Sequence, residues 1–266
     1  MNNTVWEKLK ELGLKGAAQS YAALQEDPTL LSGMGVDELM LQLLDAEANL
    51  RSINRQKVLL RQANIPLPAM LKDVTYTQER GDELKPKITQ LATLNFIRMG
   101  QNVNIYGQTA TGKSFIASAL ARKACMSGFS TLYSGTKELI AELKLKAGTA
   151  AYKAKLKLLK NKSLLILDDF CLTQYDQEDQ SILFDVLNDR YSRKSTVIVS
   201  QKTPIRWNQE MKETTLSESI VSRASTNNFE LVLKGKSLRT NLSFNNDVTG
   251  NAEQTEIITA AETARK

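Results

Sequence analysis

The spacing of apolar residues divides the chain into a helical N-terminal part and a longer part of mixed structure. Across residues 4–62 apolar residues recur every three or four positions, which predicts helices with a break at Asp27. Asp37 is placed to cap the second helix, which is expected to end at the linker 65–68 because proline cannot continue a helix. We therefore predict a small all-α domain over residues 1–68.

Short apolar runs alternate with helical stretches from residue 84 onward. The run at 164–167 is apolar throughout, as expected for a strand that is covered on both faces. Strands that alternate with helices indicate an α/β fold built on a parallel sheet. We predict this domain over residues 69–240, followed by a mobile polar tail over 241–266. A helix is expected at about 84–99 and another from 112 to 127, with strands at 102–106, 130–133, 164–167, 196–200 and 229–233.

Composition excludes several classes of protein and several kinds of catalytic site. No apolar run in the 266 residues approaches the ~18 needed to cross a bilayer, and the N-terminus lacks a secretion signal, so we expect a cytoplasmic protein with no membrane partner. Cys125 and Cys171 fit neither a disulfide framework nor a zinc motif and are expected to be reduced thiols near the core. The chain has no histidine, which excludes Ser-His and Cys-His catalytic pairs.

Basic residues are concentrated in the centre of the chain. The net charge is +6, and residues 76–240 carry 25 basic against 16 acidic side chains. Such an excess favours a polyanionic partner, nucleic acid first, although it also serves solubility alone.

A phosphate-binding motif follows the first expected strand. The signature G-x-x-x-x-G-K-[ST] is met by Gly107, Gly112, Lys113 and Ser114. Glycine allows backbone N–H groups to curl around phosphates, and the helix that begins here presents its positive end to the anion. Lys113 is expected to reach the β- and γ-phosphates and Ser114 to bind Mg²⁺. The residues expected to contact ATP are Gly107, Gln108, Thr109, Ala110, Thr111, Gly112, Lys113, Ser114 and Phe115.

Polar side chains end two of the other strands. Asp168 and Asp169 follow the apolar strand, where one carboxylate can bind Mg²⁺ and the next can polarise the attacking water. We assign these roles to Asp168 and Asp169 in that order, and since aspartate is shorter than glutamate, hydrolysis is expected to be slow. Ser200 and Gln201 end the strand at 196–200 and are expected to hold the water, the alternative being a pair that caps a loop.

The sequence resembles the AAA+ ATPases of the IstB/DnaC group, specifically the IstB-type transposition helpers of bacterial insertion sequences. The resemblance covers roughly residues 5–240. Its more specific part is the stretch from Asp189 to Thr196, which leads to Ser200-Gln201, followed by Ser222-Arg223 and the segment 233–239. The phosphate loop departs from the family at Gln108, Thr109 and Ala110, where relatives often carry an extra glycine or proline, and Cys171 stands where relatives often have glycine.

The resemblance implies a P-loop AAA+ core with strand order 5-1-4-3-2 and an N-terminal domain that engages DNA and builds an oligomer. ATP would lie at each junction between subunits. Arg223 would then be an arginine finger that reaches the neighbour's nucleotide, whereas the residues alone favour a surface salt bridge. Arg239 matches a family arginine of uncertain role. A transposase encoded nearby is the implied protein partner.

Two basic segments are candidates for DNA contact. Apart from Tyr152 in the second, neither has aromatic residues interleaved for base stacking, so we expect binding to the backbone of duplex DNA with little sequence preference. A solvated helix face is the alternative for both segments. The first segment is Arg51, Arg55, Lys57 and Arg61, and the second is Lys144, Lys146, Lys153, Lys155 and Lys157, with Lys160 and Lys162 beyond them.

These features favour an ATPase, stimulated by DNA or a partner, that assembles on duplex DNA, recruits or activates a transposase and is reset by hydrolysis. A helicase loader of the DnaC type is the main alternative, because the two cores resemble each other. A small-molecule kinase leaves the lysine cluster unexplained, and a scaffold that binds ATP without hydrolysing it is the fourth possibility.

Overall fold

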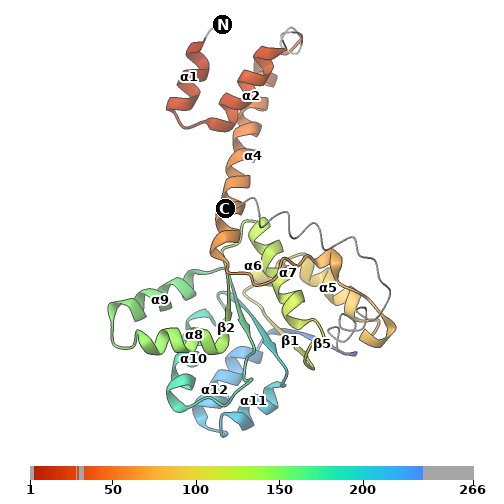
Figure 1. The fold of residues 1–266 in the computed structure, drawn as a ribbon, viewed down its shortest axis with the longest axis vertical. Helices are drawn as coiled ribbons and strands as arrows, with labels where there is room; N and C mark the ends of the chain where they lie inside the picture. The colour runs from red at the N-terminus through yellow and green to blue at the C-terminus, as the bar shows by residue number, and fades with distance from the viewer. Residues whose placement is uncertain (1–2, 28, 30–32, 236–266) are drawn as a thin grey trace, which may run out of the picture.

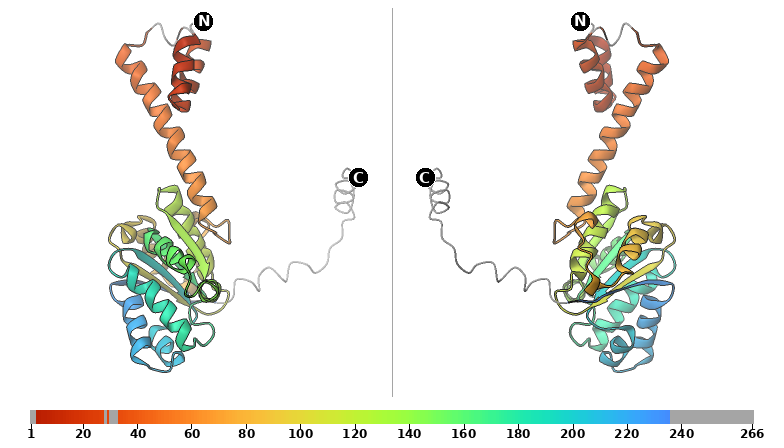
Figure 2. Two further views of the ribbon diagram at one scale, coloured as in Figure 1. Left: turned by 90° about the vertical axis from the view of Figure 1, so that its left-hand side faces the viewer. Right: turned by 90° about the vertical axis from the view of Figure 1, so that its right-hand side faces the viewer.

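Three helices of the residues that the structure describes form an N-terminal extension that projects from an α/β body (Figures 1 and 2). The structure is a computed structural model that describes residues 3–27, 29 and 33–235. The helix α4 begins one residue before Asp37, which lies in its first turn, and Gly35 precedes it without a side-chain cap. The expected cap is therefore wrong, although an acidic side chain in a first turn still complements the helix dipole. The three helices are α1 (Asn3–Glu11), α2 (Lys15–Glu26) and α4 (Val36–Gln62).

A close contact joins α2 to α4. A Cβ atom added to Gly16 would lie 2.5 Å from the carbonyl oxygen of Ala46, so only glycine lets the two backbones approach this closely. The first N–H groups of α2 lack a cap from Leu14. The buried Glu47 accepts them instead, at 2.7 Å from the Gly16 nitrogen and 3.3 Å from that of Ala17. A side chain of α4 thus caps the start of α2.

The other end of α4 contacts the body, at helix α7 (Lys113–Met126) and strand β2 (Thr131–Gly135). The carbonyl of Ala63 accepts a hydrogen bond of 2.8 Å from the Tyr133 nitrogen. Because α4 is one uninterrupted helix of 27 residues, it connects the extension to the body without a loop between them.

The body is built on a five-stranded sheet with the order β2-β3-β4-β1-β5, in which every pair of neighbours is parallel. This confirms the predicted α/β class and the order 5-1-4-3-2 of a P-loop AAA+ core. Tyr106 of β1 stands opposite Ser200 of β4, so the carboxyl ends of the central strands meet at one edge. Besides β2, the strands are β1 (Asn102–Gly107), β3 (Leu164–Asp168), β4 (Ser195–Ser200) and β5 (Asn228–Leu233).

Helices cover both faces of the sheet (Figure 1). In β3, Leu164 and Ile166 face the core under α7, while Leu165 and Leu167 face the opposite core. The first face is covered by α5 (Leu84–Ala92), α6 (Asn95–Arg98) and α7, and the second by α8 (Thr136–Leu145), α9 (Ala150–Asn161), α10 (Gln177–Arg190), α11 (Pro204–Glu210) and α12 (Thr215–Ser225). Two short 3₁₀ helices, η1 (Leu71–Asp73) and η2 (Gln78–Arg80), precede them.

The structure differs from the expected elements at two further places. Residues 12–14 interrupt the stretch expected to be helical up to Asp27 and divide it into α1 and α2. The single helix expected over 84–99 is two helices, because the buried Leu94 takes a left-handed conformation (φ 59°) that interrupts helical hydrogen bonding. Cys125 and Cys171 are free and buried, as predicted. The tail 241–266 and Arg239 lie outside the described residues. Among the helices of the described segments, none has the length and apolarity that a bilayer crossing requires.

Candidate nucleotide-binding site

The phosphate motif forms the loop between β1 and α7. A Cβ atom on Gly107 would lie 2.7 Å from the carbonyl oxygen of Leu233 and 2.8 Å from the hydroxyl of Thr111, so the loop closes only with glycine there. Gly112 has a φ of 92° and is the N-cap of α7, which places Lys113 and Ser114 in the first turn. The backbone thus forms a cradle that ends in unpaired helical N–H groups, the arrangement that binds phosphate.

Lys113 lies inside this cradle. Its Nζ atom donates to the carbonyl oxygen of Gln108 at 2.7 Å, and the residue is buried. Burial lowers the pKa of Lys113, while the charges of Asp168 and Asp169 oppose that shift. The lysine is therefore close enough to both carboxylates for their charges to act on it.

Asp168 is held by Tyr133 of the neighbouring strand β2 and by Thr136 at the start of α8. The hydroxyl of Tyr133 donates to its carboxylate, and the hydroxyl of Thr136 donates to its backbone carbonyl at 2.7 Å. Burial and then the charge of Asp168 raise the pKa of Tyr133 well above its usual range, while Ser114 is among the groups that lower it, so all three side chains meet. The sequence pattern gave no signal for Tyr133, because its partner lies 35 residues away.

The protein supplies only some of the oxygen ligands that a magnesium ion would need at this point. Within the described residues, no group of three or more His, Cys, Asp or Glu side chains could hold a metal. Ser114 and Asp168 would supply two oxygens, and the remaining ligands of an octahedral ion would come from phosphate and water, as is common for Mg²⁺. The residues present therefore fit a magnesium ion that arrives with a nucleotide.

Asp169 and Gln201 lie at the open side of the loop. Asp169 is exposed, takes a left-handed conformation (φ 53°) and donates its N–H to Asp168 at 2.9 Å. The hydroxyl of Thr109 in the phosphate loop donates to the side-chain oxygen of Gln201 at 2.9 Å. The end of β4 is thereby tied to the loop.

Ser200 is engaged elsewhere. Its hydroxyl donates to the Phe170 carbonyl at 2.7 Å and accepts from the Trp207 ring nitrogen at 2.9 Å and the Lys202 nitrogen at 3.1 Å. Since the residue is 1% exposed, this geometry leaves no route from its hydroxyl to a bound water. The expectation that Ser200 holds water thus does not fit the structure, in which its hydroxyl bonds to Phe170, Lys202 and Trp207.

Arg80 is a second residue at the site that sequence reasoning missed. It is 7% exposed, and its guanidinium donates to the carbonyl of Thr111 in the phosphate loop and, at 2.7 Å, to that of Thr75. A cavity of about 160 Å³ lies beside it, lined also by Gly112 and Phe115. Arg80 follows no recognisable motif, so only the tertiary contact reveals it.

Comparison with known proteins agrees with this geometry. The sequence profile of the IstB-like ATP binding protein family matches residues 7–245. The chain belongs to the IstB-like ATP-binding family. An insertion sequence ATP-binding protein of Sinorhizobium fredii is 32% identical over 87% of this chain and 92% of its own length. The ATP-binding protein of an insertion sequence of Pseudomonas fluorescens is 33% identical over 76% of this chain and 87% of its own length.

Solved structures share the fold of this IstB-like chain. The DnaC helicase loader matches 62% of this chain and 97% of its own with a TM-score of 0.51 and 22% identity. AMPPCP-bound DnaA from Aquifex aeolicus matches 70% of this chain and 58% of its own with a TM-score of 0.53 and 19% identity. These identities are low, so the likeness shows the fold alone.

Arg223 of this IstB-like chain lies away from its own phosphate loop. Its backbone carbonyl accepts from Asn102 at 2.9 Å, and Asn102 begins the strand that ends at the loop. The guanidinium donates to Asn188 at 2.9 Å and stacks 4.5 Å from the ring centre of Phe184. Within one chain, Arg223 is therefore at the opposite end of β1 from the phosphates.

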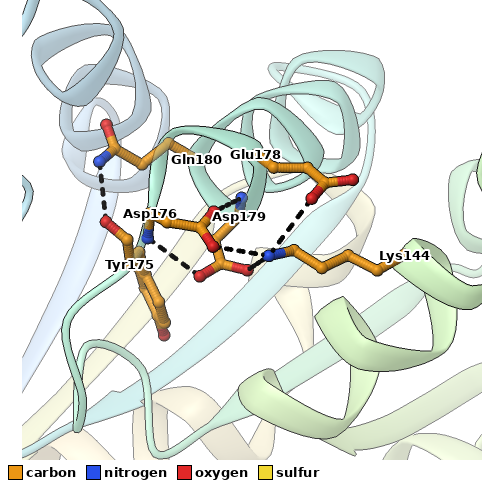
Figure 3. Close-up of polar contacts among 6 residues, drawn as sticks. All are labelled: Lys144, Tyr175, Asp176, Glu178, Asp179 and Gln180. Carbon is orange, nitrogen blue, oxygen red and sulfur yellow. Dashed lines mark hydrogen bonds and ion pairs between the residues drawn. The ribbon is translucent and has the colours of Figure 1, made fainter.

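Lys144 is surrounded by carboxylates at the start of α10 (Figure 3). Its Nζ atom lies 2.8 Å from oxygens of Asp176 and Asp179 and 3.5 Å from Glu178. The hydrogen bond to Asp176, followed by that to Asp179, raises the pKa of Lys144 above its usual range. Three carboxylates against one ammonium make the local charge negative, which disfavours the expected contact of Lys144 with DNA.

The other lysines of this segment divide into paired and unpaired groups. Lys146 and Lys155 both pair with Glu142, and Lys160 lies 3.1 Å from Asp189. Lys153 and Lys157 are exposed on one face of α9 and pair with no carboxylate in the described residues. On α4, Arg51 pairs with Glu47, while Arg55 donates to the Gly128 carbonyl at 3.3 Å, and Lys57 and Arg61 are exposed.

Proposed function

We propose that the chain is an ATPase that helps an insertion-sequence transposase. The observation that carries this proposal is the meeting of Lys113, Asp168 and Asp169 around the phosphate loop, with Gln201 bonded to that loop. A binding site for ATP alone has no need of a second carboxylate and an amide at its open side. The insertion-sequence names of the relatives support the helper role.

Each side chain has a role in this proposal. Lys113 and the loop N–H groups would bind the phosphates, and Ser114 and Asp168 would hold the magnesium ion that accompanies them. Asp169 polarises the water, and Gln201 orients it, while Ser200 supports Gln201 from below. Bound ATP supplies the phosphoryl group, and hydrolysis is slow because the carboxylate of Asp169 is short.

The site is shared between subunits in this proposal. Arg223 lies far from its own loop, so its charge can act on a phosphoryl group only if a neighbouring subunit provides one. This favours an oligomer with ATP at its junctions, in which the N-terminal extension helps to build the assembly. ATP then controls assembly rather than modifying a separate substrate.

Duplex DNA and a transposase are the proposed partners, and the bacterial cytoplasm is the proposed location. Exposed basic residues on α4 and α9, chiefly Lys57, Arg61, Lys153 and Lys157, support contact with phosphates. Assembly with ATP on DNA would recruit or activate the transposase, and hydrolysis would reset it. The likeness to the DnaC helicase loader concerns the fold alone, so it does not favour loading of a helicase.

The decisive experiment measures phosphate release by wild type and Asp169→Asn, with and without random-sequence duplex. The variant should still bind ATP, because Lys113 and the loop remain, but should lose most hydrolysis. Wild type should be faster with duplex than without it. Equal turnover by the two proteins would refute the role of Asp169, and no turnover by wild type under any condition would favour the scaffold.

A further inference from the structure

Two adjoining cavities lie between α4 and the end of α7. The first, of about 490 Å³, is lined by Arg51 and Arg55 of α4 and by Gly128 after α7. The second, of about 320 Å³, is lined by Lys72, Arg122 and Lys123. Both are also lined by Met126 and Ser127, so they form one depression, here called the α4–α7 groove.

The lining of this groove is basic. None of the residues that line either cavity is acidic. Arg51 pairs with Glu47, but Arg55, Lys72, Arg122 and Lys123 form no ion pair with a carboxylate in the segments that the structure describes. These positive charges repel one another, and an anion bound between them would reduce that repulsion. The arrangement therefore favours an anionic ligand.

Arg122 gives a second, independent indication. Its Nε atom is buried and donates to no described acceptor. A buried donor without an acceptor is destabilising and is uncommon in folded proteins. The flat guanidinium has the geometry to bind phosphate oxygens, and because the Nε atom is buried, an anion in the groove would complete its hydrogen bonding only by drawing the side chain outward.

We infer that the α4–α7 groove binds the phosphate backbone of duplex DNA. This rests on the DNA binding proposed above and adds α7 to the surface. The polar residues in the first cavity, Ser52, Gln56 and Ser127, suit contact with phosphate and sugar. No aromatic ring lines either cavity, so the groove lacks the stacking surfaces that single strands use.

The position of the groove links DNA to the nucleotide. Helix α7 begins at the phosphate loop and ends at the groove, and Lys113 and Arg122 are about 14 Å apart along its axis at 1.5 Å per residue. One rigid helix therefore contacts both ligands.

The test is the salt dependence of duplex binding, measured by fluorescence anisotropy of a labelled random-sequence duplex in the presence of ATP. Arg122→Gln/Lys123→Gln should weaken binding and reduce the slope of log K against log salt by about 2, or about 0.9 per lost contact. Arg206→Gln/Lys212→Gln is the matched control and should leave the slope unchanged, because it removes two exposed charges in and just after α11, a helix that lies at the end of the body away from α4 (Figure 1).

Further variants separate the possible outcomes. Arg122→Lys/Lys123→Arg keeps both charges and should keep the slope. Lys123→Gln alone is exposed, should fold normally and should reduce the slope by about 1. The groove would be overturned as a DNA site if wild type shows a steep salt dependence and both Arg122→Gln/Lys123→Gln and Lys123→Gln show the same slope as wild type.

Two other results also count against the inference. If glutamine substitution leaves duplex binding intact but abolishes binding of poly-glutamate, the groove docks an acidic protein segment instead. If wild type itself shows no salt-dependent duplex binding, the proposed DNA-binding function fails first, and the groove fails with it.

Discussion

The carboxylate assigned to magnesium depends on a hydroxyl from the neighbouring strand. Tyr133 donates to Asp168 and is buried, so it fixes the orientation of that carboxylate toward Ser114 and Lys113. Residues that orient a metal ligand commonly alter metal affinity or activity by about 10–100-fold when removed. Tyr133 is therefore a positioning residue for the proposed reaction.

Tyr133→Phe should raise the Mg²⁺ concentration needed for half-maximal ATP hydrolysis by about 10-fold or more, because Asp168 loses its donor. Binding of a fluorescent ATP analogue in the presence of a chelator should change little. Tyr106→Phe is the matched control, since the buried Tyr106 hydroxyl has no hydrogen-bond partner among the described residues. An unchanged Mg²⁺ requirement in Tyr133→Phe would contradict this role.

Residues of the site differ in how far the sequence predicts them. Gly107 to Ser114 form a local motif whose residue spacing is enough to predict the loop conformation. Asp168 is predictable because it ends an apolar strand at the same edge of the sheet as that loop. Tyr133 and Arg80 reach the same place through tertiary contacts, which no local pattern encodes. Ser200 shows the reverse case, because its position at a strand end was predicted but its hydroxyl faces into the core.

At the scale of elements, the strands and most helices follow from hydrophobic spacing, because each buries a regular face. The prolines at 66 and 68 mark the end of α4 in the sequence. Its start has no comparably strict signal, so the N-cap was predicted at Asp37, whereas the helix begins at Val36 after Gly35. The interruption at Leu94 combines a buried side chain with a left-handed backbone conformation. Packing of this side chain in the core stabilises the strained backbone, and the sequence nearby does not encode that packing.

The contact between α2 and α4 should be sensitive to acid. Hydrogen bonds to Glu47 from Arg51 and, with smaller effect, from the Gly16 and Ala17 N–H groups lower its pKa below the usual 4.5. A carboxyl whose pKa is lower in the folded state contributes stability above 4.5, and this is lost as the pH falls through the folded value.

Amide hydrogen exchange at Gly16 and Ala17 should therefore accelerate, after correction for intrinsic rates, as the pH falls below 4.5. Glu47→Gln, which cannot ionise, should exchange faster at neutral pH and lose this extra dependence. Glu38→Gln, on the exposed face of the same helix, is the control and should behave as wild type. A pH profile shared by wild type and Glu47→Gln would show that Glu47 does not hold the two helices together.

At the scale of the whole molecule, the two halves of the proposed catalytic site lie at opposite ends of the parallel strands. Lys113 follows the carboxyl end of β1, and Asp168 and Asp169 lie at the carboxyl end of β3 on the same edge of the sheet, whereas Arg223 is bound near the start of β1 through Asn102. In the proposed function, a single chain presents an incomplete site on one side and its complement on the other. Side-by-side association of identical subunits would bring the two together, as in a heterologous interface.

Mixing two inactive variants tests this arrangement. Arg223→Ala should bind ATP normally but hydrolyse it about 10³-fold more slowly, because the transition-state charge loses its guanidinium. Lys113→Ala should lose tight ATP binding. In an equal mixture, turnover should return to about a quarter of the wild-type value, since random association joins an intact loop to an intact arginine at about one junction in four. If Arg223 acted within its own chain, or merely stabilised α12 through Asn188, every mixed junction would contain a defective site and activity would stay at the level of the separate variants.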